Sequence, residues 1–167
     1  IGWIGSPSTA RHIQVAKNAL INICSDSNVQ FLAIGPNSSD LNDIPVKIIP
    51  WLEETENYDL LKFDVGIMPL PDTPWERGKC GFKIIQYMAS GIPVIASPVG
   101  INNHIVDHGI NGYLAKDSYE WIKYIKLLKN DSKLRKTMGL AGQKKVKEKY
   151  SLTKTAPEIC ILLEKIK

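Results

Sequence analysis

Cysteine is scarce in this sequence of 167 residues. Only three occur, Cys24, Cys80 and Cys160, and they lie far apart without a Cys-x-x-Cys pair. An odd and sparse count does not build a disulfide-stabilised scaffold and is typical of proteins kept in a reducing compartment. We therefore expect a cytoplasmic protein whose fold depends on a hydrophobic core.

Long apolar segments are also missing. No run approaches the roughly 20 residues that a membrane-spanning helix needs. The composition, 44% hydrophobic and 23% charged, suits one domain with a sizeable core. The chain begins with IGWIGSP, without a methionine or a basic leader, so we expect a piece of a longer protein that starts at or inside a strand.

Charge of one sign is not in large excess. The net charge of +4 permits an anionic ligand but does not require one. Many lysines lie in the C-terminal segment 117–167, which has a helical pattern. Such a basic face can contact anionic lipid, so a peripheral membrane contact stays open, although a solvated face is the simpler interpretation. Because few stacking or base-reading groups are interleaved with the lysines, we expect no nucleic-acid partner.

Several familiar ligand motifs are absent. Neither the Gly-x-Gly-x-x-Gly fingerprint nor the P-loop pattern follows the first apolar segment. No Asp-x-Asp metal signature lies at a predicted strand end, because Asp40 and Asp43 are separated by Leu-Asn in a loop. His104 and His108 are four residues apart, but no third ligand accompanies them. We therefore expect no metal and no bound cofactor.

Short apolar segments alternate with helical patterns. This alternation predicts an α/β fold, a Rossmann-like parallel sheet with helices on both faces and a helical C-terminal tail. The predicted strands are Ile1–Gly5, Val29–Gly35, Val46–Pro50, Asp64–Pro69, Pro93–Ser97 and Gly112–Ala115. The predicted helices are Ser8–Ser25 (N-cap Ser8 or Thr9), Glu54–Phe63, Phe82–Ser90, a turn at Asn102–Asp107, and the tail Asp117–Lys167. Ligands of such sheets bind at the carboxyl ends of the strands.

Glycines and lysines gather in the segment GKCGFK, residues 78–83, at the start of one predicted helix. The first backbone N–H groups of a helix lack intrahelical partners, and the helix dipole is positive there. Bare backbone and two lysines at that place suit a diphosphate. The loop GSPST, residues 5–9, is a second place of this kind. A plain turn and a plain N-cap are the alternative interpretations of the two loops.

The segment FKIIQYMASGIPVIASPVGINNHIVDHGINGYLA, residues 82–115, resembles the sugar-nucleotide-binding segment of retaining glycosyltransferases of family 4, also called group 1. The motifs Gly91–Ser97 and Gly109–Leu114 together carry the likeness. The segments DLLKFDVGIMPL and IGWIGSPST resemble a strand and the first phosphate loop of that family. The resemblance covers nearly the whole chain, 1–167, as one nucleotide-sugar-binding domain, the C-terminal half of a GT-B fold. It implies an N-terminal acceptor domain outside this sequence.

The resemblance also implies where the phosphates of a donor lie. The helix-head backbone at Gly81 and Phe82, together with Lys83, would meet the diphosphate or the sugar. Gly5 and Ser6 would line the phosphates from the other side.

Two departures from the family pattern concern its glutamates. Gln86 stands where the family has the Glu that binds the ribose hydroxyls. By the same resemblance, Trp51 and Leu52 would lie near the base of the nucleotide. The other family Glu, which touches the transferred sugar, falls on Gly78, and Glu76 substitutes for it only if the loop is shifted.

The implied reaction is a metal-independent, retaining transfer of a sugar from a nucleoside-diphosphate sugar to a polysaccharide or lipid-linked acceptor. Negative charge grows on the departing diphosphate, and a preorganised positive group there contributes about 3–4 kcal/mol. We expect Lys79, Lys83 and Glu76 to be the catalytic residues. The family's Arg/Lys pair is not at its usual place, so the two lysines would replace it. The piece alone is expected to be inactive, because the acceptor groups belong to the other half.

Two alternatives belong to other functional classes. A non-catalytic nucleotide- or sugar-phosphate-binding domain is favoured by the replacement of both glutamates. A nucleotide-sugar epimerase would need acid and base residues at the anomeric carbon, and the sequence offers no strong candidates. In the resembling family the last helix crosses back to the N-terminal domain, so residues 150–167 are expected to be partly unanchored. The resemblance also places the protein in the cytoplasm or at the inner face of the membrane.

Overall fold

The computed structural model describes residues 1–165 and contains one six-stranded parallel sheet. Its strands are β1 (Gly2–Ile4), β2 (Leu32–Ile34), β3 (Lys47–Ile49), β4 (Gly66–Met68), β5 (Val94–Ala96) and β6 (Gly112–Leu114). They lie in the order β3-β2-β1-β4-β5-β6. The chain moves outward in one direction from β1 and in the other from β4, so the carboxyl ends of these two strands flank a crevice where such sheets bind ligands.

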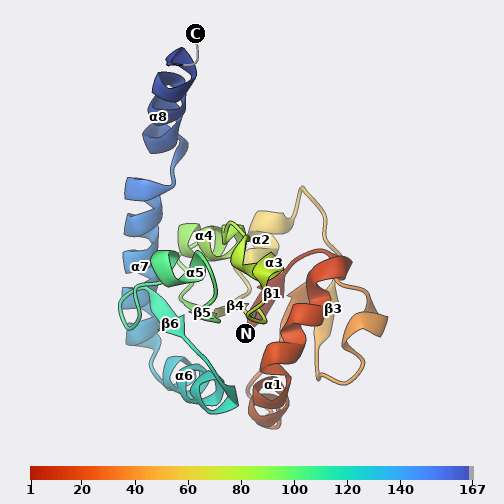
Figure 1. Cartoon of the computed structure of the whole chain (residues 1–167). Helices are drawn as coiled ribbons and strands as arrows, with labels where there is room; N and C mark the ends of the chain where they lie inside the picture. The colour runs from red at the N-terminus through yellow and green to blue at the C-terminus, as the bar shows by residue number, and fades with distance from the viewer. Residues whose placement is uncertain (166–167) are drawn as a thin grey trace.

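Helices cover both faces of the sheet, as the sequence predicted. The α-helices are α1 (Lys17–Cys24), α2 (Glu56–Leu60), α3 (Pro74–Arg77), α4 (Phe82–Ala89), α5 (Asn102–Ile105), α6 (Ser118–Asn130), α7 (Ser132–Lys149) and α8 (Leu152–Glu164). Two 3₁₀ helices, η1 (Pro7–Ala16) and η2 (Ser38–Leu41), follow β1 and β2. Figure 1 shows α1 and α6 on one side of the sheet and α2 and α4 on the other.

Alternating strand side chains fill two separate cores. Trp3 and Ile95 point to the core beneath η1, α1 and α6, while Ile4 and Val94 point to the core beneath α2 and α4. All four are nearly or fully buried. Because both faces are covered, β1, β2, β4, β5 and β6 carry no charged side chain, which explains why they read as continuous apolar runs, whereas the edge strand β3 begins with the exposed Lys47.

The predicted helix at residues 8–25 is tighter in its first part than the sequence suggested. It begins as the 3₁₀ helix η1, with Pro7 in the first turn and Ser6 at the N-cap position. Ser6 makes no side-chain cap bond, and the hydroxyl of Thr9 donates to the Ser6 carbonyl oxygen instead. The predicted caps, Ser8 and Thr9, are therefore two and three residues too late. The short helix α3 lies in a segment expected to be a loop, because four residues give no readable periodicity.

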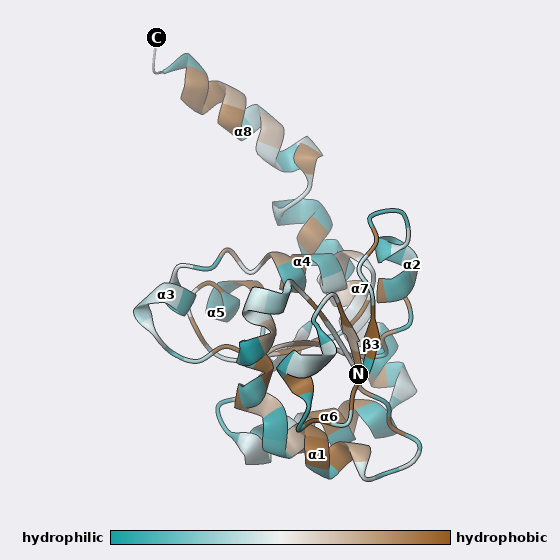
Figure 2. Cartoon of the chain, turned by 90° about the vertical axis from the view of Figure 1, so that its right-hand side faces the viewer, coloured by the Kyte–Doolittle hydropathy of each residue, from teal (hydrophilic) through white to brown (hydrophobic). Residues whose placement is uncertain are grey.

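The last helix, α8, projects away from the rest of the domain (Figure 1). It has no buried residue, and Leu152 is 82% exposed. Apolar stretches nevertheless run along it (Figure 2). For residues 150–165 this arrangement agrees with the expectation of a partly anchored tail, and residues 166 and 167 of the predicted tail lie outside the described residues. Within residues 1–165 no helix has both the length and the apolar character needed to cross a bilayer.

Candidate functional site

A cavity of about 580 Å³ lies at the carboxyl ends of β1, β2 and β3, against the head of α4. Its lining comes from the loop after each of these strands, from α2 and from α4. The lining residues are Ile4, Gly5, Ser6, Pro7, Gly35, Trp51, Glu56, Phe82, Lys83 and Gln86. Six of the eleven residues predicted from the sequence are among them: Gly5, Ser6, Trp51, Phe82, Lys83 and Gln86.

Bare backbone forms one side of this cavity. The N–H of Gly5 donates to the Ile34 carbonyl oxygen at 3.0 Å, so the first loop leaves the sheet directly beside the end of β2. Gly35 has a φ of 94°, and a Cβ built on it would lie 2.5 Å from the Gly5 carbonyl oxygen. Only glycine fits there, because the left-handed backbone and the close approach both exclude a side chain. The two loops thus meet backbone to backbone.

Lys83 supplies the cation of the cavity. Its ammonium lies 5.5 Å from the ring centroid of Trp3, within cation–π distance. Burial, and secondly the charge of Lys79, lower the pKa of the Lys83 ammonium. No ion pair found within residues 1–165 includes Lys83. A partly desolvated cation without a carboxylate partner is an anion-binding feature.

Gly81 sets the head of α4. It is the N-cap residue, with a φ of 70° and no side-chain cap bond. The left-handed backbone favours glycine, and a Cβ on Gly81 would also have to displace the end of the buried Ile105 side chain. With a bare N-cap, the N–H groups of Phe82 and Lys83 lack the partner that a capping side chain would provide. Gly81 therefore shapes the anion site from behind and is not part of the cavity lining.

Four other predicted residues also lie outside the lining. Gly78 ends α3 with an ordinary φ of −82°, and Lys79 follows it. Leu52 is exposed beside Trp51. Their predicted roles at a donor stay untested, and Lys79 contributes to the cavity through its charge on Lys83.

Glu76, the fourth, is engaged elsewhere. Its carboxylate is 3% exposed and lies 3.0 Å from His12 Nε2, and the Thr73 hydroxyl donates to its other oxygen. These contacts, that from Thr73 first, lower the pKa of Glu76, while burial lowers the pKa of His12. Glu76 thus ties the loop ahead of α4 to η1. A catalytic role for Glu76 stays a prediction, and its position favours a role in holding the loop.

The sequence reasoning missed Glu56. The side-chain amide of Gln86 donates to Glu56 Oε1 at 2.7 Å, and Trp51 Nε1 donates to Glu56 Oε2. Glu56 stands in the first turn of α2, thirty residues before Gln86. No local spacing links the two positions, so only the fold brings this carboxylate into the cavity.

The two motifs that carried the resemblance hold loops rather than line the cavity. The buried Ser97 hydroxyl accepts from the Leu70 N–H at 2.9 Å and joins the segments after β5 and β4. Asn111 is 1% exposed, and its side chain accepts from the Asp107 N–H at 2.9 Å and donates to the Ile105 carbonyl oxygen. Ser97 and Asn111 therefore fix the loops beside the site through bonds to backbone groups.

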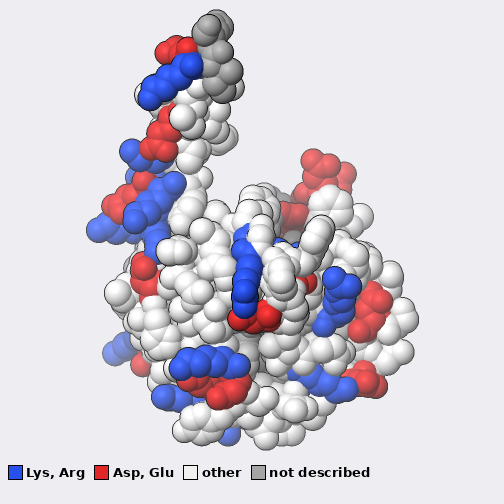
Figure 3. Space-filling model, in the orientation of Figure 1, with Lys and Arg blue, Asp and Glu red and all other residues white. Residues whose placement is uncertain are grey.

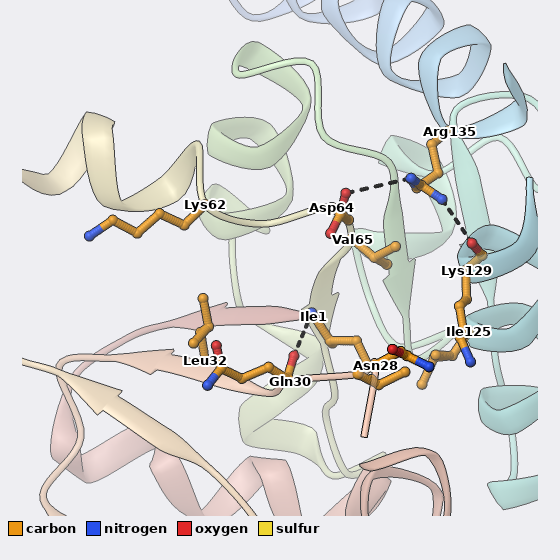
Figure 4. Close-up of a pocket in the computed structure, with 11 residues that line it drawn as sticks. Ile1, Asn28, Gln30, Leu32, Lys62, Asp64, Val65, Ile125, Lys129 and Arg135 are labelled. Carbon is orange, nitrogen blue, oxygen red and sulfur yellow. Dashed lines mark hydrogen bonds and ion pairs between the residues drawn. The ribbon is translucent and has the colours of Figure 1, made fainter. Parts of the chain in front are cut away.

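A second hollow, of about 390 Å³, lies at the amino ends of the strands (Figure 4). Its charged groups already have partners. Arg135 lies 3.6 Å from Asp64 and donates to backbone carbonyl oxygens, and Lys129 pairs with Asp26. The hollow is also at the wrong edge of the sheet for the usual ligand site. The cavity beside α4 is thus the better candidate.

Comparisons with known proteins show the same fold. The family model described as glycosyl transferases group 1 matches residues 1–131. Anabaena HepE in complex with UDP and glucose superposes with a TM-score of 0.81 at 19% identity, covering 98% of this chain and 47% of that chain. A mutant of S. aureus TarM in complex with fondaparinux, alpha-GlcNAc-glycerol and UDP gives 0.73 at 20% identity, covering 96% of this chain and 34% of that one. The C-terminal domain of the group 1 protein LpcC from Francisella tularensis gives 0.65 at 23%, covering 91% and 84%.

The chain spans less than half the length of HepE and TarM. A search of curated proteins found no match. The structural likenesses show the fold, and the family model covers most of the sequence. The chain belongs to the group 1 glycosyltransferases and has the fold of the C-terminal half of a GT-B enzyme.

Proposed function

We propose that this chain is the donor-binding half of a retaining, metal-independent glycosyltransferase that uses a nucleoside-diphosphate sugar. The observation that carries the proposal is the cavity at the switch point of the sheet, with Lys83, which is in none of the ion pairs found within residues 1–165, at the head of α4. The solved structures of HepE and TarM, which contain UDP by their descriptions, support it by fold. No cofactor takes part in the proposed reaction.

The diphosphate would lie between the Gly5–Ser6 loop and the head of α4. Lys83 and the N–H groups of Phe82 and Lys83 would then face the oxygens on which charge grows as the anomeric C–O bond breaks. Such preorganised donors contribute about 3–4 kcal/mol to transition-state stabilisation. Because Lys83 is already partly desolvated, it would lose little hydration when the donor binds. Lys79 would add to the same positive potential at longer range.

The proposed enzyme needs a second half for its acceptor. The chain covers 34% to 48% of the first structures it resembles, which leaves room for an N-terminal domain. We place that domain against α8, whose apolar side chains, among them Leu152 and Ile159, are exposed. This half alone would bind donor without transferring sugar.

The proposed acceptor is a polysaccharide or a lipid-linked saccharide, reached from the cytoplasm or from the inner face of a membrane. Figure 3 shows acidic and basic side chains interspersed along the projecting α7–α8 arm. The pairs Lys144–Glu148 and Lys154–Glu158 illustrate this mixture. A mixed surface supports only a weak attraction to anionic lipid, so the membrane contact is the minor part of the proposal.

A second candidate is a nucleotide-binding domain without catalytic function. The observation that favours it is the sugar end of the site. Gly78 has no side chain, and Glu76 is buried against His12. No carboxylate of this loop therefore lines the cavity among the described residues.

The test has two steps. Calorimetry of this chain with UDP, ADP and GDP, and with their glucose and N-acetylglucosamine conjugates, should give a micromolar ligand; binding of none of them would overturn the proposal. Transfer from a radiolabelled donor by the longer protein that contains this chain then separates the two candidates. Tight nucleotide binding with no transfer from any donor would favour the non-catalytic domain.

A further inference from the structure

Glu56 is the only carboxylate among the described residues that line the cavity. Each of its oxygens accepts one hydrogen bond, Oε1 from the Gln86 amide and Oε2 from the Trp51 indole N–H. An ionised carboxylate has about four acceptor positions, so roughly half of its capacity remains open. The side chain is half-buried, and its open side faces the cavity.

Among the described residues the charge of Glu56 has no cationic partner. Both of its donors are neutral groups, and none of the ion pairs found within residues 1–165 includes it. A partly desolvated carboxylate gains most from additional O–H or N–H donors, because hydrogen bonds to a charged acceptor are about twice as strong as neutral ones. Glu56 is thus held in position and lacks donors on its ligand side.

The spacing along α4 relates Glu56 to the cation. Lys83 and Gln86 are three residues apart, so they lie on neighbouring turns of one helix face, about 4.5 Å apart along its axis. The cavity therefore has a cation beside the Gly5 loop and, one turn further on, a carboxylate held by Gln86. A nucleoside diphosphate has the matching order of groups, with an anion followed by a pair of adjacent hydroxyls.

Trp51 completes the arrangement. It is 50% exposed, and its N–H bond to Glu56 limits rotation of the indole. A fixed and half-open aromatic face beside the diol position suits a stacked nucleobase.

From this arrangement we infer that Glu56, positioned by Gln86 and Trp51, binds the 2′,3′-diol of the ribose of the nucleoside diphosphate. The site therefore selects ribonucleotides over 2′-deoxyribonucleotides. The inference rests on the proposed function and adds to it a residue outside the segment that carried the sequence resemblance. Gln86 acts here as a positioning residue, because its amide donates to the carboxylate.

The test compares UDP with 2′-deoxy-UDP, and ADP with 2′-deoxy-ADP, by calorimetry on the chain and on Glu56→Gln. The wild type should bind the better ribonucleotide about tenfold or more tightly than its 2′-deoxy form, the loss expected for one hydrogen bond to a charged group. Glu56→Gln should weaken ribonucleotide binding by a similar factor and leave 2′-deoxy binding nearly unchanged. Glu53→Gln, an exposed glutamate nearby, is the charge-matched control and should change neither.

Thermal unfolding of each variant checks that the fold is intact, and Glu56→Asp, which keeps the charge but shortens the reach, should retain part of the preference. Nucleotide binding with an unchanged ribose preference in Glu56→Gln would overturn the inference and leave the proposed function standing. Absence of any nucleotide binding by the wild type would instead overturn the proposed function, and the inference with it.

Discussion

Replacing Lys83 by methionine separates the stability of this fold from its proposed function. Methionine keeps an unbranched apolar side chain and removes the ammonium together with its contact to the Trp3 ring. Burial lowers the pKa of Lys83, which means that the folded state disfavours its charge. Between the lowered pKa and the ordinary value of 10.5, Lys83 binds more protons in the unfolded chain than in the folded one. The free energy of unfolding therefore falls as the pH drops through this window, and at neutral pH the charged Lys83 destabilises the fold by the full amount. At neutral pH the variant should therefore be at least as stable as the wild type.

Ligand binding should change in the opposite direction. A hydrogen bond to a charged group contributes about 1.5–3 kcal/mol, so Lys83→Met should weaken binding of a nucleoside diphosphate by about 10- to 150-fold. The lower end applies if the N–H groups at the head of α4 retain the phosphates. A Lys83→Arg variant keeps the charge and should lose less affinity than Lys83→Met.

The assay is calorimetry with UDP at low and moderate salt, combined with chemical unfolding of the same preparations. Lys144→Met is the control, because Lys144 carries the same charge on α7 and its side chain is 75% exposed. It should alter affinity less than threefold through long-range charge alone. Equal affinities of wild type and Lys83→Met would refute the assignment of Lys83 as a ligand-binding cation. A marked loss of stability in the variant would refute the claim that the charge of Lys83 destabilises the fold.

Two further predictions concern stability. Alanine at Gly139 would place a Cβ 2.0 Å from the Gly91 carbonyl oxygen, so overpacking of about 1–3 kcal/mol should outweigh the gain of about 1 kcal/mol in helix propensity. Alanine at Gly142 would meet the buried Met88 side chain at 2.9 Å and should cost less, because a side chain can shift more easily than a backbone carbonyl. Urea unfolding should therefore show the larger loss for Gly139→Ala, and equal midpoints of the two variants would contradict it. Burial lowers the pKa of His12 below 6.5, so the stability it contributes is present above that pH and is lost as the pH falls through the lowered pKa. His12→Gln, which can still donate to Glu76, should make the unfolding midpoint depend less on pH between about pH 7 and pH 5. A variant with the same pH dependence as the wild type would argue against a neutral buried imidazole.

Much of the fold could be predicted because its physical causes are local. A strand buried on both faces must be apolar at each position, and segments such as Val94–Ala96 show this in the sequence. The positions of the ligand loops followed from the topology of parallel sheets. The 3₁₀ geometry of η1 was missed, because the apolar spacing of a distorted first segment is close to that of an α-helix. The helix α3 was missed because its four residues make only about one turn, which is too short to show a periodic apolar pattern.

The candidate site was predictable only where its residues share a segment. Lys83 and Gln86 lie on one helix face, and their spacing places them together. The partners of Gln86 and Glu76 come from elsewhere in the chain, Glu56 thirty residues away and His12 sixty-four residues away. Whether a carboxylate faces a cavity or a buried histidine depends on these distant contacts, which no local pattern contains.

The two carboxylate substitutions consequently have different meanings. At the position of Gln86 the family pattern has a carboxylate. In this fold α2 brings the carboxylate of Glu56 to the same place, where the Gln86 amide donates a hydrogen bond to it. For the position of Gly78 no second carboxylate of the described residues lines the cavity, because Glu76, two residues earlier, is turned inward to His12 and Thr73. Replacement of a motif residue is thus no evidence against nucleotide binding when a neighbouring element supplies the same group. The replacement at Gly78 does affect how the transferred sugar can be recognised. Because this loop presents no carboxylate to the cavity, it agrees best with a donor whose sugar is recognised by the N-terminal half or by backbone N–H groups.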